Sequence, residues 1–134
     1  MTKTPPCGAP EARFRLEQAR LHLSQAQSGA VARQGTAWTN VVASNATLAG
    51  VAAADAICCD RSGRRSAGES HDAAVELLRS VLPADRRDLA TVFRRLLSVK
   101  TPAQYGGKPL AVSKAVAAVR QAEQLVEVAE VLLA

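Results

Sequence analysis

The chain has 134 residues, a length that suits one domain with a single buried core. Aromatic residues make up only 3% of it, so close-packed helices are favoured over a sheet rich in aromatic and β-branched side chains. The formal net charge is +5, and residues 61–120, with 12 basic and 5 acidic groups, carry a net +7. This surplus predicts a face that attracts anions, and arginines spread over solvated helix surfaces are the alternative.

Three cysteines, Cys7, Cys58 and Cys59, cannot form an even set of disulfides. We interpret Cys58 and Cys59 as small buried packing residues, and unpaired thiols favour a reducing cytoplasm. No signal-peptide core opens the chain, and polar residues interrupt the apolar run at 41–59, so we expect no membrane segment. Without CxxC or HxxxH spacing we expect no metal site, and no cofactor motif is present.

The first ten residues contain three prolines and a glycine, which predicts a flexible lead-in at 1–10 before a single domain at 11–134. From Glu11 to about Gln27, apolar residues recur at spacings of three and four. This period is typical of an amphipathic helix, which we expect to be the first of the fold.

The stretch 40–59 predicts the central helix, because its residues are small and apolar on nearly every helical face. Its start is expected between Thr36 and Thr39. Asp55 is its one firm acid, so a hydrogen bond to a Tyr, Arg or Ser across the bundle is expected. The alternative is that Asp55 lines a functional groove.

Ser70 predicts the N-cap of a third helix, which Pro83 should interrupt. That helix is expected to end by Thr101, because Pro102 disfavours helix in the residue before it. Ser113 predicts the cap of the last helix. The expected fold is therefore all-α, an up-down four-helix bundle with the third helix interrupted near Pro83.

Three motifs occur in order: AAADAICC in the central helix, GESHDAAVELL at the start of the third, and LLSVKTPAQYGG before the last. Together they resemble the HEPN superfamily of small helical bundles, with the closest likeness to an uncharacterised actinobacterial branch, and the resemblance runs from Glu11 to the end. HEPN proteins include ribonuclease toxins paired with nucleotidyltransferase antitoxins, host-defence ribonucleases and relatives that only bind. The resemblance implies a homodimer.

Active HEPN members carry an arginine followed after four to six residues by a histidine, at the junction into the last helix. The matching position here has Lys100 in place of the arginine, and Gln104 and Tyr105 in place of the histidine. Lysine can offer a point charge to a phosphate, whereas tyrosine is a poor base at neutral pH. The resemblance thus implies that Lys100, Gln104 and Tyr105 are what remains of a metal-independent ribonuclease site that has lost its catalyst.

Arg64 and Arg65 also stand at a permitted distance before His71, as Arg15 does before His22. We attribute these matches to chance in an arginine-rich chain. The expected contacts to RNA come from Arg64, Arg65, Arg94, Arg95, Lys100 and His71.

The sequence thus favours a cytoplasmic, toxin- or defence-related RNA-binding protein with a degenerate ribonuclease site and no membrane contact. Its expected partners are a second copy of the chain, RNA, and a nucleotidyltransferase-type antitoxin or another protein. The alternative is a structural or adaptor bundle that binds a protein partner and has no nucleic-acid role.

Overall fold

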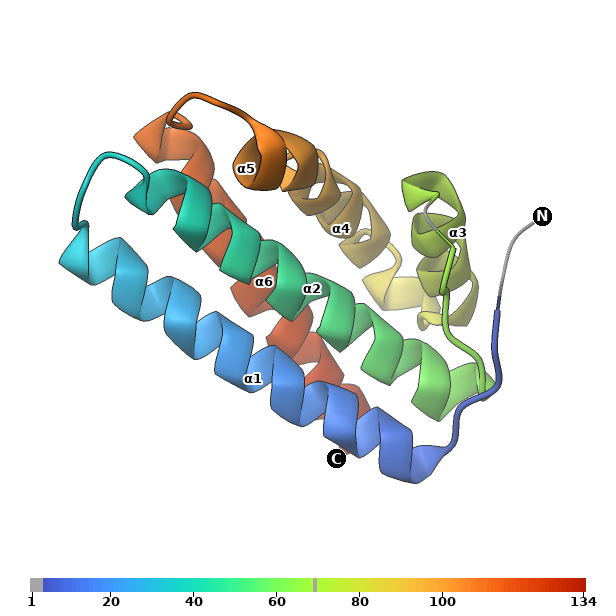
Figure 1. Cartoon of the computed structure of the whole chain (residues 1–134). Coiled ribbons are helices and arrows are strands. Elements are labelled where there is room, and N and C mark those ends of the chain that lie inside the picture. The colour runs from blue at the N-terminus through green and yellow to red at the C-terminus, as the bar shows by residue number, and fades with distance from the viewer. Residues whose placement is uncertain (1–3, 69) are drawn as a thin grey trace.

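The computed structural model describes residues 4–68 and 70–134, which form an all-helical protein (Figure 1). Its helices are α1 (Ala9–Ala32), α2 (Trp38–Ser62), α3 (His71–Val81), α4 (Leu89–Leu97), α5 (Lys100–Tyr105) and α6 (Val112–Leu133), with a 3-10 turn at Ala84–Arg86. The described residues contain no β-strand, only an isolated bridge between Pro6 and Arg64. The all-α prediction is confirmed, and the chain has more helical segments than the four long helices expected.

Helix α2 is the centre of the fold, because it packs against every other α-helix. In Figure 1, α1 runs along one side of α2, α4 and α5 lie along the other, and α6 passes behind. The length and composition of α2 would also suit a membrane span, but 67% of its apolar window is buried inside the protein, as in the core helix of a soluble protein. The central position predicted for 40–59 is confirmed.

Two glycines allow α2 to lie close to its neighbours. A Cβ atom on Gly50 would lie 2.3 Å from Cδ2 of Leu96 and 3.2 Å from Cδ1 of Leu125. A Cβ atom on Gly29 of α1 would lie 2.8 Å from Cγ2 of Val42. Since Leu96 and Leu125 are completely buried in a close-packed interior, they have little space in which to move aside. The small residues at these crossings therefore set the helix spacing.

The segment between α2 and α6 begins as the sequence predicts. The side-chain oxygen of Ser70 accepts a hydrogen bond of 3.2 Å from the backbone N–H of Ala73, so the predicted N-cap of α3 is confirmed. Helix α3 ends at Val81, and Pro83 then precedes the 3-10 turn that leads into α4. The helical pattern is thus interrupted near Pro83, as expected.

The third helix ends by Thr101 as expected, since α4 ends at Leu97, but Pro102 is not the cause. Pro102 lies in the first turn of a separate helix, α5, where its missing N–H has no helical partner to lose. One expected boundary is wrong. Ser113 does not cap the last helix, since α6 begins at Val112 with Ala111 at the N-cap and no side-chain cap bond.

The expectation of unpaired cysteines is also wrong for two of the three. Cys7 and Cys59 form a disulfide that joins positions 52 residues apart, with Cα atoms separated by 5.3 Å. Cys58 is buried and unpaired, as expected. The sequence contained no spacing rule that selects Cys7 as a partner. With this pairing, the cysteines no longer argue for a reducing compartment.

The disulfide belongs to a junction between the N-terminal segment and the loop after α2. The backbone N–H of Cys7 donates to the carbonyl of Gly63 at 2.8 Å, and the N–H of Arg65 donates to the carbonyl of Pro5 at 3.2 Å. The flexible lead-in expected at 1–10 is therefore bonded to the loop from Thr4 onward, while residues 1–3 lie outside the described part of the chain.

Candidate functional site

A cavity of about 90 Å³ lies where the C-terminal half of α2 faces the starts of α3 and α5. We call it the Asp55 cavity. Its walls come from α2, the loop after it, and helices α3, α4 and α5, and they consist of Val51, Ala54, Asp55, Cys58, Ser66, Gly68, Ser70, His71, Ala74, Phe93, Leu97 and Lys100. The apolar side of the cavity is rigid, because Phe93 and Leu97 are buried in the main core.

Two of the residues predicted to contact RNA meet in this cavity. Lys100 is the first residue of α5 and His71 is the first residue of α3, and both side chains are partly buried. The cap on Ser70 fixes where α3 begins and so directs His71 to the cavity wall. A primary ammonium group and an imidazole at one opening can bind an anion, and histidine can also transfer protons.

Asp55 supplies the acid of the cavity. Burial raises the pKa of its carboxyl from 3.8 to about 6, the charges of Arg15 and Arg65 oppose that rise, and Glu11 adds to it. Among the described residues its side chain makes no hydrogen bond, so the bonded partner expected across the bundle is not found. The sequence analysis also allowed that Asp55 lines a groove, and in the structure Asp55 lines this cavity. A carboxyl with a pKa near neutrality can exchange a proton during function.

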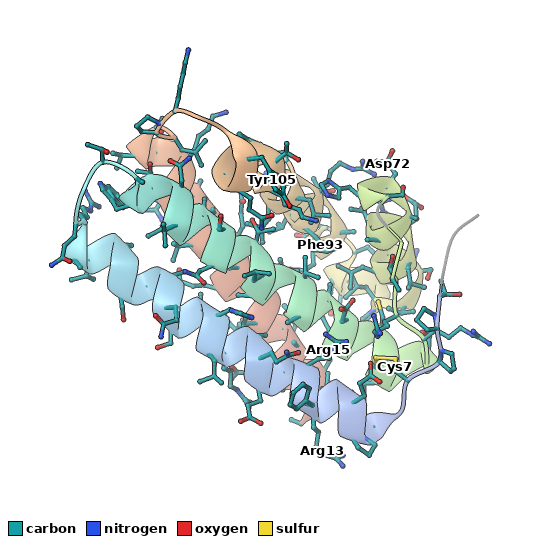
Figure 2. The ribbon with its side chains drawn as sticks, viewed as in Figure 1. Cys7, Arg13, Arg15, Asp72, Phe93 and Tyr105 are labelled. Carbon is teal, nitrogen blue, oxygen red and sulfur yellow. A yellow bond between two sulfur atoms is a disulfide. The ribbon has the colours of Figure 1, made fainter. Side chains whose placement is uncertain are left out.

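Two buried polar atoms beside Asp55 lack hydrogen-bond partners within the described part of the chain. They are Oγ of Ser66, which lines the cavity, and Nε of Arg15. Figure 2 shows Arg15 between α1 and α2. Its Nε lies 3.8 Å from Oε2 of Glu11, a salt-bridge contact too long for a hydrogen bond. A buried hydroxyl without a partner is costly, so Ser66 is available to a polar ligand in the cavity.

Cys58 also faces the cavity, but its thiol is not a reactive group. Burial raises the pKa of Cys58 to about 12, and the nearby charge of Asp55 adds to the effect. With this pKa the thiol stays protonated at neutral pH. Because the thiolate, and not the thiol, is the nucleophile and the metal ligand, Cys58 acts as a packing residue, as the sequence predicted.

The remaining residues of the predicted catalytic group do not reach the cavity walls. Gln104 and Tyr105 lie at the far end of α5 from Lys100, and neither lines the cavity. Tyr105 is 78% exposed, and Figure 2 labels its side chain. The loop that follows is held by Asn40, whose side chain donates to the carbonyl of Lys108 at 3.1 Å. The structure thus places Tyr105 and Lys100 at opposite ends of α5, although only five positions separate them in sequence.

The predicted RNA-binding arginines are largely engaged with other groups. Arg64 donates to the carbonyl of Thr4 at 2.8 Å, and Arg65 forms an ion pair of 2.9 Å with Glu11. Arg94 of α4 pairs with Asp72 of α3. Arg95 is exposed and forms no ion pair with any residue that the structure describes. Pairing leaves these side chains less positive potential than their number suggests.

One further group of potential ligand atoms lies outside the cavity. The sulfur atoms of Cys7 and Cys59 and a carboxylate oxygen of Glu11 lie within 4.8 Å of one another. In the structure the two sulfur atoms are bonded to each other, which leaves neither free as a thiolate ligand.

Ser66 was not predicted, because no local sequence pattern distinguishes it from other serines. The acidic residue Asp55 within an alanine-rich helix was the usable signal, because a buried carboxyl must face something polar.

Comparison of the chain with protein-family models and with curated proteins finds no match.

Proposed function

We propose that this chain is a HEPN-like helical protein that binds RNA at the Asp55 cavity and cleaves it slowly or not at all. The observation that carries the proposal is the convergence on one cavity of Lys100, His71 and the hydroxyl of Ser66, which has no hydrogen-bond partner among the described residues. A cation, an imidazole and a hydroxyl donor together suit a phosphate group better than they suit an apolar ligand.

The charges of the cavity suggest how a nucleotide would lie in it. Above a pH of about 6, the pKa of Asp55, its carboxylate repels a phosphate, so the phosphate is expected at the edge formed by Lys100 and His71. The carboxylate can instead accept a hydrogen bond from a ribose 2′-hydroxyl, the group that distinguishes RNA from DNA. We therefore expect RNA to bind more tightly than DNA of the same sequence, and Asp55→Ala to reduce that difference.

Slow cleavage follows from the position of Tyr105. In the HEPN resemblance, the residue that follows the cation supplies the base, and here that place is taken by Gln104 and Tyr105, which do not line the cavity. An RNA bound there would meet the charge of Lys100 without the family's catalytic histidine. In a toxin or defence setting, such a protein acts by occupying RNA, and its protein partner is a nucleotidyltransferase-type antitoxin or another protein.

A homodimer forms part of the proposal, with support from exposed apolar side chains on the two longest helices. Phe14 and Leu21 lie seven positions apart on α1, and Val41 and Leu48 lie seven positions apart on α2, so each pair shares one helix face. Leu48 is 43% exposed, although most of its helix lies in the core of the fold. These side chains also favour the second candidate function, an adaptor that binds a protein partner.

In the proposed bundle, α1, α2, the segment α3–α4 and α6 take the places of the four antiparallel helices of a HEPN-like fold. The short helix α5 takes the place of the junction into the last helix, where HEPN ribonucleases carry their active site. The Asp55 cavity then lies where the resemblance predicts nucleic-acid contact.

Binding and cleavage of a labelled single-stranded RNA test the proposal. We expect filter binding at low salt to show affinity that falls steeply as salt rises, and gel analysis of the same RNA to show little or no cleavage. Absence of RNA affinity at low salt would favour the adaptor. Cleavage by the wild type that Tyr105→Phe abolishes would refute the argument from the missing histidine.

A further inference from the structure

The disulfide lies in a group of three side chains that can hold a metal ion once it is reduced. Cys7 comes from the N-terminal segment, Glu11 from the first turn of α1, and Cys59 from the last turns of α2. Figure 2 shows Cys7 where the start of α1 lies beside the end of α2. One ligand atom from each lies within 4.8 Å of the other two.

We propose that the reduced chain binds a thiophilic divalent cation of the Zn²⁺ class through Cys7, Cys59 and Glu11. This goes beyond RNA binding and concerns a different part of the molecule. A dithiol reductant supplies two electrons and two protons, which convert the disulfide into two thiols, and the reductant leaves as its own disulfide. The ion then displaces the two thiol protons to solvent and forms two metal–sulfur bonds.

The spacing of the three groups suits a tetrahedral ion. Zinc binds thiolate sulfur at about 2.3 Å and carboxylate oxygen at about 2.0–2.2 Å, so neighbouring ligand atoms lie roughly 3.5–3.8 Å apart. In the disulfide the two sulfur atoms are bonded to each other, so reduction must let them move apart to this spacing, while the Cα atoms, 5.3 Å apart, stay in place. The carboxylate oxygen of Glu11 already lies within 4.8 Å of both sulfur atoms. Two thiolates and one carboxylate leave the fourth position to water.

The backbone keeps the three residues together when the disulfide is absent. The N–H of Cys7 bonds to the carbonyl of Gly63 at 2.8 Å, and the N–H of Ala12 bonds to the carbonyl of Gly8 at 3.0 Å. These bonds hold the N-terminal segment against both α1 and the end of α2. Reduction therefore leaves a preformed pair of thiols, which lowers the ordering cost of binding an ion.

The charges around the cluster also suit a bound ion. Two thiolates and a carboxylate carry one more negative charge than a divalent ion neutralises. Arg65 lies 2.9 Å and Arg15 3.8 Å from Oε2 of Glu11, so positive charge is present to offset the excess. Because these contacts go to Oε2, the other carboxylate oxygen of Glu11 can turn toward the ion.

Cys58 provides a matched control, because it is adjacent to Cys59 in sequence but faces the Asp55 cavity and is absent from the cluster. A cysteine-to-serine substitution there removes one thiol without removing a proposed ligand.

Metal titration of the full chain tests the proposal, with Zn²⁺ as the ion and Co²⁺ as the spectroscopic probe. The protein is reduced with excess dithiol, freed of reductant under nitrogen, and titrated against a chromogenic chelator. We expect one ion per reduced chain, none per oxidised chain, and thiolate-to-cobalt charge-transfer absorption with Co²⁺. Cys7→Ser should abolish this absorption, Glu11→Gln should weaken Zn²⁺ binding by about tenfold or more, and Cys58→Ser should keep both.

Failure of the reduced wild type to bind Zn²⁺ stoichiometrically would overturn the proposal, and so would a Co²⁺ spectrum without thiolate bands. Loss of binding in Cys58→Ser, with a circular-dichroism spectrum that shows intact helices, would do the same. The decisive comparison uses one wild-type chain in two redox states, so it holds even if a variant fails to fold.

Discussion

Lys100 and His71 line the same cavity, although each is the first residue of a different short helix and neither lies near the other in sequence. Helix α2 makes this possible, because its C-terminal half carries Asp55 and contacts both α3 and α5. The site is therefore assembled on the buried helix, while Tyr105 remains exposed at the other end of α5.

The close contact of Gly50 with its neighbours predicts a large effect of a small substitution. Gly50→Ala would place a Cβ atom 2.3 Å from Cδ2 of the completely buried Leu96, so overpacking should lower the free energy of unfolding by about 1–3 kcal/mol. Urea denaturation measures the change. Gly107→Ala is the control, because a Cβ there meets nothing within 4 Å. An unchanged or increased stability of Gly50→Ala, as helix propensity alone would give, would contradict the packing described.

The raised pKa of Asp55 predicts how stability depends on pH. Between the ordinary pKa of 3.8 and the folded pKa of about 6, the folded chain binds more protons than the unfolded chain. Stability from this group is therefore greatest below the lower value and decreases as pH rises through both, by up to about 3 kcal/mol. Asp55→Asn removes this loss, so its free energy of unfolding relative to the wild type should be about 2 kcal/mol higher at about pH 7.5 than at about pH 4.5.

Chemical denaturation at the two pH values tests this prediction. The groups that act on Asp55 are Arg15, Arg65 and Glu11, and all remain in the variant. Asp60→Asn, the substitution of an exposed carboxylate near the end of α2, controls for the loss of one negative charge. An Asp55→Asn effect that is the same at both pH values would show that Asp55 is not desolvated.

The disulfide predicts a stability difference that depends on redox state. It closes a segment with a separation of 52 residues, so its loss in Cys7→Ser should lower the free energy of unfolding by about 2–4 kcal/mol under oxidising conditions. Thermal melting with and without a reductant measures this. In the presence of reductant and a metal chelator the variant and the wild type should have nearly equal melting temperatures. A Cys7→Ser variant as stable as the oxidised wild type would contradict the pairing.

The exposed apolar face of α2 predicts a change in assembly. Leu48→Glu should shift the chain from a dimer toward a 14.1 kDa monomer in sedimentation equilibrium at concentrations of roughly tens of micromolar. Val131→Glu is the control, because Val131 is also about half exposed but lies on α6. A wild type that is wholly monomeric at these concentrations would rule out the proposed homodimer.

The longer helices were predictable because each carries a strong local signal. The small apolar residues of 40–59 identify a buried helix, and Ser70 identifies the start of α3. Pro102 was misleading because the same residue that ends one helix is tolerated in the first turn of the next. Local sequence could not decide between these two roles.

The site was only partly predictable, because contact between distant segments decides it. Lys100 was identified through the HEPN resemblance and Asp55 as the acid of an apolar helix, but their meeting with His71 and Ser66 depends on how α3 and α5 pack against α2. The bond between Cys7 and Cys59 has the same origin, since it requires the N-terminal segment to lie beside the end of α2. Sequence spacing does not contain that information.

The most direct test of RNA binding at the Asp55 cavity compares two lysine substitutions. Filter binding of single-stranded RNA over a range of salt concentrations is measured for the wild type, for Lys100→Ala, and for Lys114→Ala, which removes the same charge from an exposed position on α6. We predict that Lys100→Ala weakens binding and reduces the salt slope by about one phosphate contact, while Lys114→Ala stays close to the wild type. Equal effects of the two substitutions, or no effect of Lys100→Ala, would contradict RNA binding at this cavity.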